Sequence, residues 1–261
     1  MGVVSFLSDF GLKDNFVGVV KAVILKINPC VQIVDICHQI SPQDILEGAF
    51  ILRNSFRFFP KGTVHLVVID PGVGTERKKI IVKTKNFFFV APDNGILSLS
   101  LEIEPPLKII EITEDNYFLK PVSNSFQARD IFAPVVGYLS KGEPIEKFGR
   151  RINSYKSLAL PKVILRNKSL EGKIIYVDHF GNLITNIESK RFFDFVKSKK
   201  FRIRIGNFTI EKLFKSYKEA SFKEPIALIN SFDCLEIAFR NKDASKILKS
   251  KKFDKVIIEL I

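Results

Sequence analysis

Apolar residues in the first part of the chain follow two alternating patterns, one typical of strands and one typical of helices. The segment Val3–Leu7 is mostly apolar, and a helical repeat at i, i+3, i+4, i+7, i+8 and i+11 begins at Phe16. The Asn28–Pro29 pair ends this repeat, and Gln32–Cys37 predicts the next strand. Strands that alternate with helices predict an α/β layer.

The same alternation continues to about residue 140. The sequence Ser41-Pro42-Gln43-Asp44 predicts a helix start with Ser41 as the side-chain cap, and we expect that helix to run to about Phe59. Further strands are expected at Thr63–Ile69, Ile80–Thr84 and Phe87–Ala91, and a last helix at Asp130–Leu139. The strand at 63–69 is almost entirely apolar, as in a sheet covered on both faces. These elements predict a mostly parallel sheet.

From Pro161 onward the pattern changes to short strands separated by turn residues. The strands are expected at Lys162–Leu165, Lys173–Val177, Leu183–Ile187, Phe201–Ile205, Ile226–Ile229, Leu235–Phe239 and Lys255–Leu260. Such spacing is typical of a small β-sandwich or barrel. We therefore predict an α/β N-terminal domain with a mostly parallel sheet over residues 1–158. A small all-β, barrel-like C-terminal domain is predicted over residues 159–261.

Length and composition narrow the class of protein. A chain of 261 residues that is 46% hydrophobic can bury a core without disulfides or a metal ion. No apolar run approaches the roughly 20 residues that cross a bilayer, and the N-terminus does not resemble a signal peptide. Cys30, Cys37 and Cys234 are odd in number and lack C-x-x-C spacing, which favours reduced thiols. We expect a cytoplasmic protein with no membrane partner.

The formal net charge of +13, from 41 basic and 28 acidic residues, suggests nucleic acid as a partner. The basic residues are scattered, however, and the densest groups are short, as at 197–200 and 249–252. No predicted helix carries a continuous basic stripe with interleaved aromatic residues. A solvated basic surface is therefore favoured, and nucleic-acid binding stays the weaker alternative.

Three acidic residues, Asp9, Asp70 and Asp178, each close an apolar strand and open a turn. Ligands of open α/β sheets bind beyond the carboxyl ends of the strands, where a carboxylate can accept both hydroxyls of a ribose. Asp before Pro or Gly is also ordinary turn chemistry, so this alternative stays open for each residue. Arg77 follows Asp70 closely enough for the loop to bring the two together, and a surface Arg beside Lys78 and Lys79 is the alternative that the sequence leaves open.

Other common chemistries lack support in the sequence. The loop with Gly72 and Gly74 matches neither G-x-x-x-x-G-K-[ST] nor G-x-G-x-x-G, so no nucleotide-phosphate motif is present. His65 lies inside a predicted strand and is expected to be structural. His38 and His179 adjoin acidic residues but have no metal-ligand spacing between them, so we expect no metal site. No G-x-S-x-G elbow occurs either. The residues alone indicate a small-molecule site of acidic character and name no reaction.

Seven segments together carry a resemblance to a known family. They are SDFG (8–11), SPQDILEGAF (41–50), VVIDPGVGTER (67–77), APDNG (91–95), ARDIFAPVVGYL (128–139), VDHFGN (177–182) and INSFDCLEIA (229–238). In this order they resemble the S-adenosylmethionine hydroxide adenosyltransferases, the hydrolases related to fluorinase and chlorinase. The resemblance implies an α/β N-terminal domain and a β-barrel C-terminal domain. It also implies a homotrimer whose sites lie between one subunit's N-terminal domain and its neighbour's C-terminal domain.

The reaction implied by this resemblance is attack of water or hydroxide on the ribose C5′ of S-adenosyl-L-methionine. Adenosine and L-methionine are released, and no cofactor is needed. The resemblance assigns Asp9 to the ribose hydroxyls and Asp178 with Ser231 to the methionine end. It places Phe180, Asn182, Glu236 and Phe239 around the adenine, and Asn94 in the wall formed by the N-terminal domain.

The family hydrolases place an Asp, an Arg and a His around the attacking water. Asp70 and Arg77 match this trio, but Gln127 stands where the His is expected. An amide orients water but does not take up a proton near neutral pH. We therefore expect a hydrolase that is slow, with a non-catalytic S-adenosylmethionine or adenosine binder as the alternative. A halogenase is less favoured, because halogenases of this group depart from the Asp and Arg pair.

Overall fold

The computed structural model describes residues 2–219 and 221–261. By its internal contacts the chain divides into two compact units, Met1–Leu158 and Ala159–Ile261, called here the N-terminal unit and the C-terminal unit. Each unit has its own buried hydrophobic core.

Within its described residues, the N-terminal unit contains a seven-stranded sheet in the order β2-β1-β3-β5-β4-β6-β7. The strands are β1 (Val3–Ser8), β2 (Gln32–Cys37), β3 (Val64–Val68), β4 (Lys79–Lys83), β5 (Phe88–Pro92), β6 (Lys108–Ile112) and β7 (Gly149–Ile152). The carboxyl ends of β1 and β3 lie side by side, because Ser8 pairs with Val68. Asp9 and the residues that follow β3 therefore leave the sheet at the same edge.

The prediction of a mostly parallel sheet is only partly correct, because the sheet is mixed. Strands β2, β1, β3 and β5 run parallel, whereas β4, β6 and β7 pair in antiparallel fashion. Only four residues, 84–87, connect β4 to β5. Parallel neighbours need a crossover of a dozen or more residues, so a link this short enforces antiparallel pairing.

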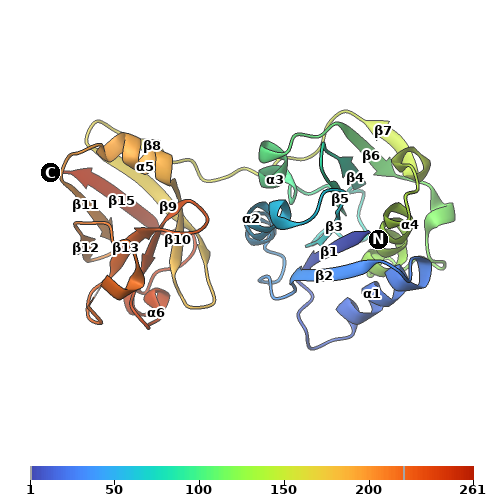
Figure 1. The fold of residues 1–261 in the computed structure, drawn as a ribbon, viewed down its shortest axis with the longest axis horizontal. Helices are drawn as coiled ribbons and strands as arrows, with labels where there is room; N and C mark the ends of the chain where they lie inside the picture. Colours follow the sequence, from blue (N-terminus) through green and yellow to red (C-terminus); the bar gives the residue numbers. More distant parts are fainter. Residues whose placement is uncertain (1, 220) are drawn as a thin grey trace. The chain divides into compact units, whose positions relative to one another are not determined.

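Helices cover both faces of this sheet (Figure 1). Helices α1 (Phe16–Ile27) and α4 (Ala133–Ser140) pack against one another, and α2 (Ile45–Ser55) packs against α3 (Ser98–Ile103). Short turns complete the unit: η1 (Phe56–Phe58), η2 (Asp115–Tyr117), η4 (Ile145–Phe148) and the π-helical turn η3 (Ala128–Phe132). Val20 and Ile24 of α1 are fully buried in the core, as the helical repeat predicts.

The start of α2 differs from the prediction. The helix begins at Ile45 with Asp44 as its cap, whose side chain accepts a hydrogen bond from the Glu47 N–H, and it ends at Ser55. Gln43 has a φ of 66°, which is not helical, so the helix cannot start at Pro42 as the Ser41 cap would require. The backbone N–H of Gln43 donates instead to the carboxylate of Asp9.

The C-terminal unit is built on an eight-stranded, barrel-like sheet, counted within its described residues, and every strand pair in it is antiparallel. Its order is β12-β11-β15-β9-β10-β14-β13, with β8 beside β9. The strands are β8 (Ile164–Leu165), β9 (Ser169–Val177), β10 (Leu183–Glu188), β11 (Phe201–Ile205), β12 (Phe208–Ile210), β13 (Ile226–Ile229), β14 (Cys234–Ala238) and β15 (Lys255–Leu260).

The C-terminal unit also contains helices that the strand pattern did not predict. These are α5 (Ser189–Val196) and α6 (Ala244–Leu248), with the short turn η5 (Tyr217–Glu219). In α5 the side chains of Phe192 and Val196, four positions apart, are buried against the sheet. The all-β prediction therefore holds for the sheet but not for the whole unit.

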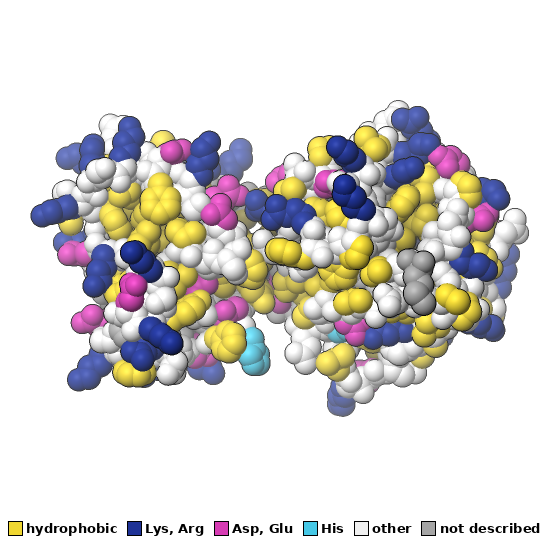
Figure 2. Space-filling model, in the orientation of Figure 1, with side chains coloured by type: hydrophobic (Ala, Val, Ile, Leu, Met, Phe, Trp, Pro, Cys, Tyr) yellow, Lys and Arg dark blue, Asp and Glu magenta, His cyan; other side chains and the backbone are white. Residues whose placement is uncertain are grey.

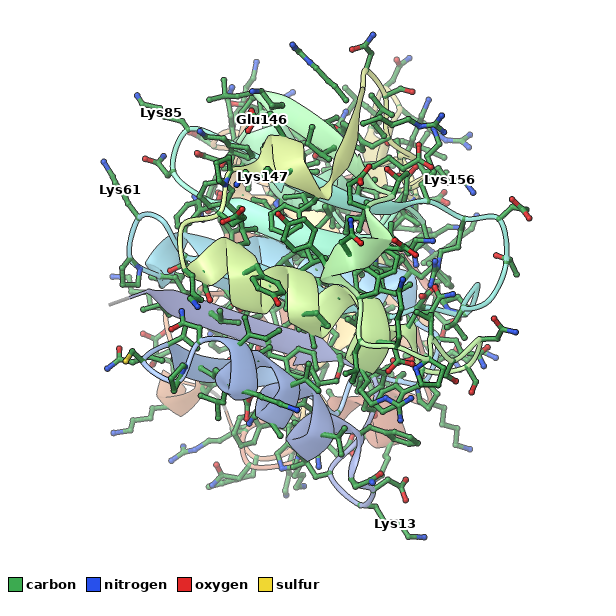
Figure 3. All side chains as sticks on the ribbon, turned by 90° about the vertical axis from the view of Figure 1, so that its right-hand side faces the viewer. Lys13, Lys61, Lys85, Glu146, Lys147 and Lys156 are labelled. Atoms are coloured by element: carbon green, nitrogen blue, oxygen red, sulfur yellow. The ribbon has the colours of Figure 1, made fainter. Side chains whose placement is uncertain are left out.

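Charged side chains of both signs are dispersed over the face shown in Figure 2, with no continuous basic band across either unit. Lys13, Lys61 and Lys85 extend outward from the N-terminal unit (Figure 3). Several basic residues have acidic partners, including Arg202 with Glu211. None of the described helices has the length and apolar character needed to span a membrane.

Candidate active site

Asp9 lies in the turn that follows β1. One of its carboxylate oxygens, Oδ2, accepts a 2.8 Å hydrogen bond from the backbone N–H of Gln43. The side chain is partly exposed, so a carboxylate held at one oxygen remains accessible at the end of the sheet. A carboxylate in this position can accept further hydrogen bonds.

Asp70, Arg77 and Gln127 come together on the same unit. Arg77 Nε lies 2.8 Å from Asp70 Oδ1, and its Nη2 also donates to Asp70 Oδ2. The same Nη2 donates to Gln127 Oε1 at 2.8 Å. Asp70 and Arg77 form a buried ion pair, because their side chains are only 6% and 5% exposed. The structure thus brings the three residues assigned to catalysis into one hydrogen-bonded cluster.

Local backbone geometry creates this cluster. The loop between Asp70 and Arg77 folds through consecutive turns, in which Val73 N–H donates to Asp70 O and Thr75 N–H donates to Gly72 O. Gly74 has a φ of 81°, and a Cβ there would lie 2.8 Å from the carbonyl oxygen of Asn124. A side chain is therefore excluded at this position.

Gln127 lies at the N-terminal cap position of η3, a π-helical turn directly before α4, and its side chain makes no capping hydrogen bond there. Such turns are rare and are frequent at functional sites. Gln127 is 8% exposed, and its Oε1 is occupied by Arg77. Its amide nitrogen is then the atom that can donate to a bound group. Arg77 has one further donor, Nη1, which is buried and makes no hydrogen bond to any described residue. Arg77 Nη1 and the Gln127 nitrogen are therefore the donors of this cluster that have no acceptor among the described residues.

Asn94 supports the same region from the turn after β5. Its side-chain nitrogen donates to the Ile69 carbonyl at 2.8 Å, and its side-chain oxygen accepts from Ile96 N–H at 3.1 Å. Both ends of the amide are thus engaged with the backbone. Asn94 holds the strand end that carries Asp70.

The C-terminal unit carries a second group of the assigned residues. A cavity of about 570 Å³ is lined by Asp178, Phe180, Asn182, Tyr217, Phe239, Asn241, Lys242 and Asp243. Asp178 closes the turn after β9, because its carboxylate accepts hydrogen bonds from the N–H groups of Phe180 and Asn182 and from the Asn182 side chain. Phe180 is 73% exposed at the tip of this turn and meets the His179 ring edge to face, so the exposed part of its ring can stack on a planar group.

Glu236 and Ser231 are not among the residues that line this cavity. Glu236 is buried, and its carboxylate accepts hydrogen bonds from Tyr217 Oη at 2.7 Å and from Asn230 Nδ2 at 3.0 Å. Burial raises the pKa of Glu236, although both hydrogen bonds oppose this shift. Glu236 therefore anchors Tyr217 from behind. Ser231 lies in the exposed turn between β13 and β14.

Sequence reasoning missed four residues of the cavity wall. Tyr217 lies in a polar segment without strand or helix periodicity, so no pattern distinguishes it. Asn241, Lys242 and Asp243 follow β14 as a run of turn-forming and charged residues, which is uninformative by itself. Asp243 caps α6, and hydrogen bonds from Ser245 and the Lys246 N–H lower its pKa to about 2. It is therefore an anion at neutral pH.

Metal ligands do not gather in the described part of the chain. Within residues 2–219 and 221–261, no group of three or more His, Cys, Asp or Glu side chains could hold a metal ion. His38 and His65 are paired with serines, Ser8 and Ser5 respectively.

Together, the fold and the clustered side chains define a class of two-unit protein. The chain combines an α/β unit, whose strand ends carry Asp9 and an Asp–Arg–Gln cluster, with a barrel-like unit that carries an acidic and aromatic cavity. Two family models match it: the SAM hydroxide adenosyltransferase N-terminal domain over residues 4–149, and the C-terminal domain over residues 172–257. The chain belongs to the SAM hydroxide adenosyltransferase family, in which SAM denotes S-adenosylmethionine.

Individual relatives agree with this assignment. The chain is 34% identical to an (R)-S-adenosyl-L-methionine hydrolase of Methanocaldococcus jannaschii, with 99% of this chain and 96% of the relative covered. It is 28% identical to a fluorinase of Nocardia brasiliensis, with 71% of each chain covered. Among solved structures, an uncharacterized conserved protein from Thermotoga maritima matches with a TM-score of 0.91 and 39% identity, over 98% of this chain and 99% of that one.

Proposed function

We propose that this chain is an S-adenosyl-L-methionine hydrolase. Water attacks the ribose C5′, the C5′–O bond forms and the C5′–S bond breaks. The electron pair of the broken bond goes to the sulfur, so the sulfonium becomes the neutral thioether of L-methionine. The water proton is released, and the other product is adenosine.

The chemistry requires little from the protein beyond position and charge. A neutral thioether leaves without protonation, so no general acid is required. The main task is to hold an oxygen nucleophile in line with C5′, which by itself removes a large part of the barrier. Carboxylates such as Asp9 and Asp178 also suit a substrate with sulfonium and ammonium charges. The proposed reaction needs no cofactor.

The observation that carries this proposal is the buried cluster of Asp70, Arg77 and Gln127. Arg77 Nη1 and the Gln127 amide nitrogen are donors to an oxygen nucleophile, and Asp70 accepts its proton as the C5′–O bond forms. Both Asp70 oxygens already accept hydrogen bonds from Arg77, so the proton of the water must compete with these bonds. We therefore propose a slow reaction.

The size of the electrostatic stabilisation that Arg77 can give to a hydroxide supports a slow rate. A guanidinium about 4 Å from a developing hydroxide contributes about 4 kcal/mol at an effective dielectric constant of 20. This stabilisation lowers the pKa of the water by about three. Bulk water, with a pKa of about 15.7, would remain mostly un-ionised at neutral pH. The rest of the rate acceleration must then come from the positioning of the water and from concerted transfer of its proton to Asp70.

A binding protein without turnover is the second candidate. The observation that favours it is Gln127, which gives the cluster an amide that can donate and accept hydrogen bonds but cannot take up a proton. Such a protein would hold S-adenosylmethionine or adenosine by the same acidic residues.

We further propose that the chain acts as a cytoplasmic homotrimer. In this arrangement the N-terminal unit of one subunit supplies Asp9 and the Asp70 cluster, and the C-terminal unit of its neighbour supplies the cavity with Asp178. A solution mass three times that of one chain would support it. Mixing the inactive variants Asp70→Asn and Asp178→Ala should restore activity, since mixed trimers contain sites with both residues intact. Mixed trimers without activity would contradict shared sites.

Incubation with S-adenosyl-L-methionine, followed by chromatography of the products, tests the function. We expect adenosine and methionine in equal amounts. Tight binding with no product over hours would instead establish the binding protein. A 5′-halogenated adenosine that forms only when chloride or fluoride is added would establish a halogenase.

A further inference from the structure

A series of side-chain contacts connects the buried end of β1, next to Asp9, to the surface of the N-terminal unit. Ser8 Oγ lies 2.7 Å from His38 Nδ1, and both residues are buried, at 0% and 4% exposure. His38 Nε2 lies 3.0 Å from Asp35 Oδ1. The other Asp35 oxygen pairs with Lys21 of α1 at 2.5 Å. His38 thus joins the residue next to Asp9 to a surface ion pair.

The charges along this series of contacts set the direction of its hydrogen bonds. Burial lowers the pKa of His38, although Asp35 opposes the shift, so the ring is neutral at pH 7. Burial alone would raise the pKa of Asp35, but hydrogen bonds from Lys21 and His38 outweigh it and keep the carboxylate ionised. The imidazole proton is then best placed on Nε2, toward Asp35, although this contact is bent. His38 Nδ1 accepts the proton of Ser8.

The backbone of the same segment holds the turn at two more points. The His38 carbonyl accepts a 2.7 Å hydrogen bond from Gly11 N–H. Gln43 N–H donates to Asp9 Oδ2 at 2.8 Å, from a backbone with a φ of 66°. His38 and Gln43 therefore hold the turn that carries Asp9 at three points: the Ser8 hydroxyl, the Gly11 N–H and the Asp9 carboxylate.

We propose that His38 is a positioning residue for Asp9. By holding Ser8 and Gly11, it keeps the Asp9 carboxylate aimed at the ribose hydroxyls. This proposal rests on the proposed function, because it takes a ribose as the group that Asp9 binds. Recognition of two hydroxyls by one carboxylate depends on its orientation, and small displacements of a binding group are costly. His38 is buried and acts through its contact with Ser8.

The chain contains a matched control for this role. His65 is also fully buried, and its Nδ1 lies 2.6 Å from the hydroxyl of Ser5, three residues before Ser8 on β1. Both pairs place a buried imidazole against a serine of the same strand. The Ser5–His65 pair, however, lies among Phe56, Phe87 and Phe89 and not at the Asp9 turn.

The test compares the binding of adenosine and 2′,3′-dideoxyadenosine by calorimetry. We expect the wild type to prefer adenosine by about tenfold or more, since the carboxylate accepts hydrogen bonds from both hydroxyls. The variant His38→Ala should lose most of this preference, and His38→Asn should recover part of it by offering an amide to Ser8. His65→Ala should lower the Tm and keep the preference. An unchanged preference in His38→Ala would overturn the proposal.

Two further measurements keep the outcomes distinct. Ser8→Ala removes the Ser8–His38 contact with little change in volume, and it should weaken the ribose preference even if His38→Ala fails to fold. The rate of hydrogen exchange at Gly11 N–H reports how often the turn opens, and it needs no ligand. We expect this exchange to be faster in His38→Ala but not in His65→Ala. Equal exchange overturns the positioning role. A wild type without ribose preference, together with faster exchange, would instead contradict the proposed role of Asp9.

Discussion

Nη2 of Arg77 donates a 2.8 Å hydrogen bond to Oε1 of Gln127, a residue fifty positions later in the chain. The contact is buried, and the same guanidinium pairs with Asp70. The amide therefore has its acceptor committed to Arg77, which leaves its nitrogen as the group that can face a nucleophile. This relationship makes Gln127 the residue whose replacement is most informative.

Replacing Gln127 with His should accelerate the reaction. An imidazole at this position takes up a proton near neutral pH, and general base catalysis contributes about 10²–10⁴-fold. We expect at least a tenfold rise in adenosine release, measured by chromatography. Gln127→Asn retains an amide and serves as the control, which should show no rise. Equal rates for wild type and Gln127→His would contradict the claim that the amide limits turnover.

Asp70→Asn should abolish turnover and leave adenosine binding intact, because Asp70 is proposed to accept the proton and not to hold the nucleoside. The change also leaves the buried Arg77 without its anionic partner, which typically costs about 3–5 kcal/mol. Calorimetry with adenosine and thermal unfolding report the two effects separately. The double variant Asp70→Asn/Arg77→Met should regain part of the lost stability. Undiminished turnover in Asp70→Asn would refute its role.

Acid should destabilise the fold through His65. Burial lowers the pKa of His65 to about 3, far below the value of about 6.5 expected in the unfolded chain. The unfolded state then binds the proton first as the pH falls. The stabilisation is complete above pH 6.5 and is lost progressively between pH 6.5 and pH 3.

The variant Ser5→Ala/His65→Phe isolates this effect, because it removes both polar partners together. Between pH 7 and pH 5 the wild type should lose about 2 kcal/mol more unfolding free energy than the variant. Urea unfolding at both pH values measures the difference. Parallel losses in the two proteins would show that His65 is not protonated preferentially in the unfolded state.

Gly181 should tolerate no side chain. It has a φ of 83° in the turn between Phe180 and Asn182, and a Cβ there would overlap the carboxylate of Asp243 and lie 2.9 Å from its Cα. Gly206 has a φ of 52° with nothing within 4 Å of its Cβ position. Gly181→Ala should therefore lose about 1–3 kcal/mol more stability than Gly206→Ala, and it should weaken adenosine binding. Equal effects of the two changes would contradict the close packing of the turn on Asp243.

Much of the fold follows from local pattern, and the departures have physical causes. The helix at Phe16–Ile27 matches its prediction because an apolar stripe over three helical turns can be buried only when that face packs on the core. The direction of β4 follows from its short link to β5, a local signal that the prediction of a mostly parallel sheet overlooked. The pairing of β6 with β4 joins segments that are farther apart in the chain, which periodicity does not encode. At Gln43 a helix-start pattern is overridden by a non-helical backbone that delivers an N–H to Asp9.

The candidate site likewise has some residues that local sequence predicts and others that only tertiary structure brings together. Asp70 and Arg77 are predictable as neighbours because only six loop residues separate them. Gln127 joins them only through tertiary structure, and its assignment came from the family resemblance. Tyr217 has no sequence signal, because its place beside the Asp178 cavity depends on a hydrogen bond to the buried Glu236.

The most direct test of the account is the reaction carried out in ¹⁸O-labelled water with mass spectrometry of the products. Attack of water on C5′ places one labelled oxygen in the 5′-hydroxyl of adenosine and none in methionine. We predict this labelling pattern at a low rate for the wild type and at a higher rate for Gln127→His. Unlabelled adenosine, or a label found in methionine, would contradict attack of water at C5′.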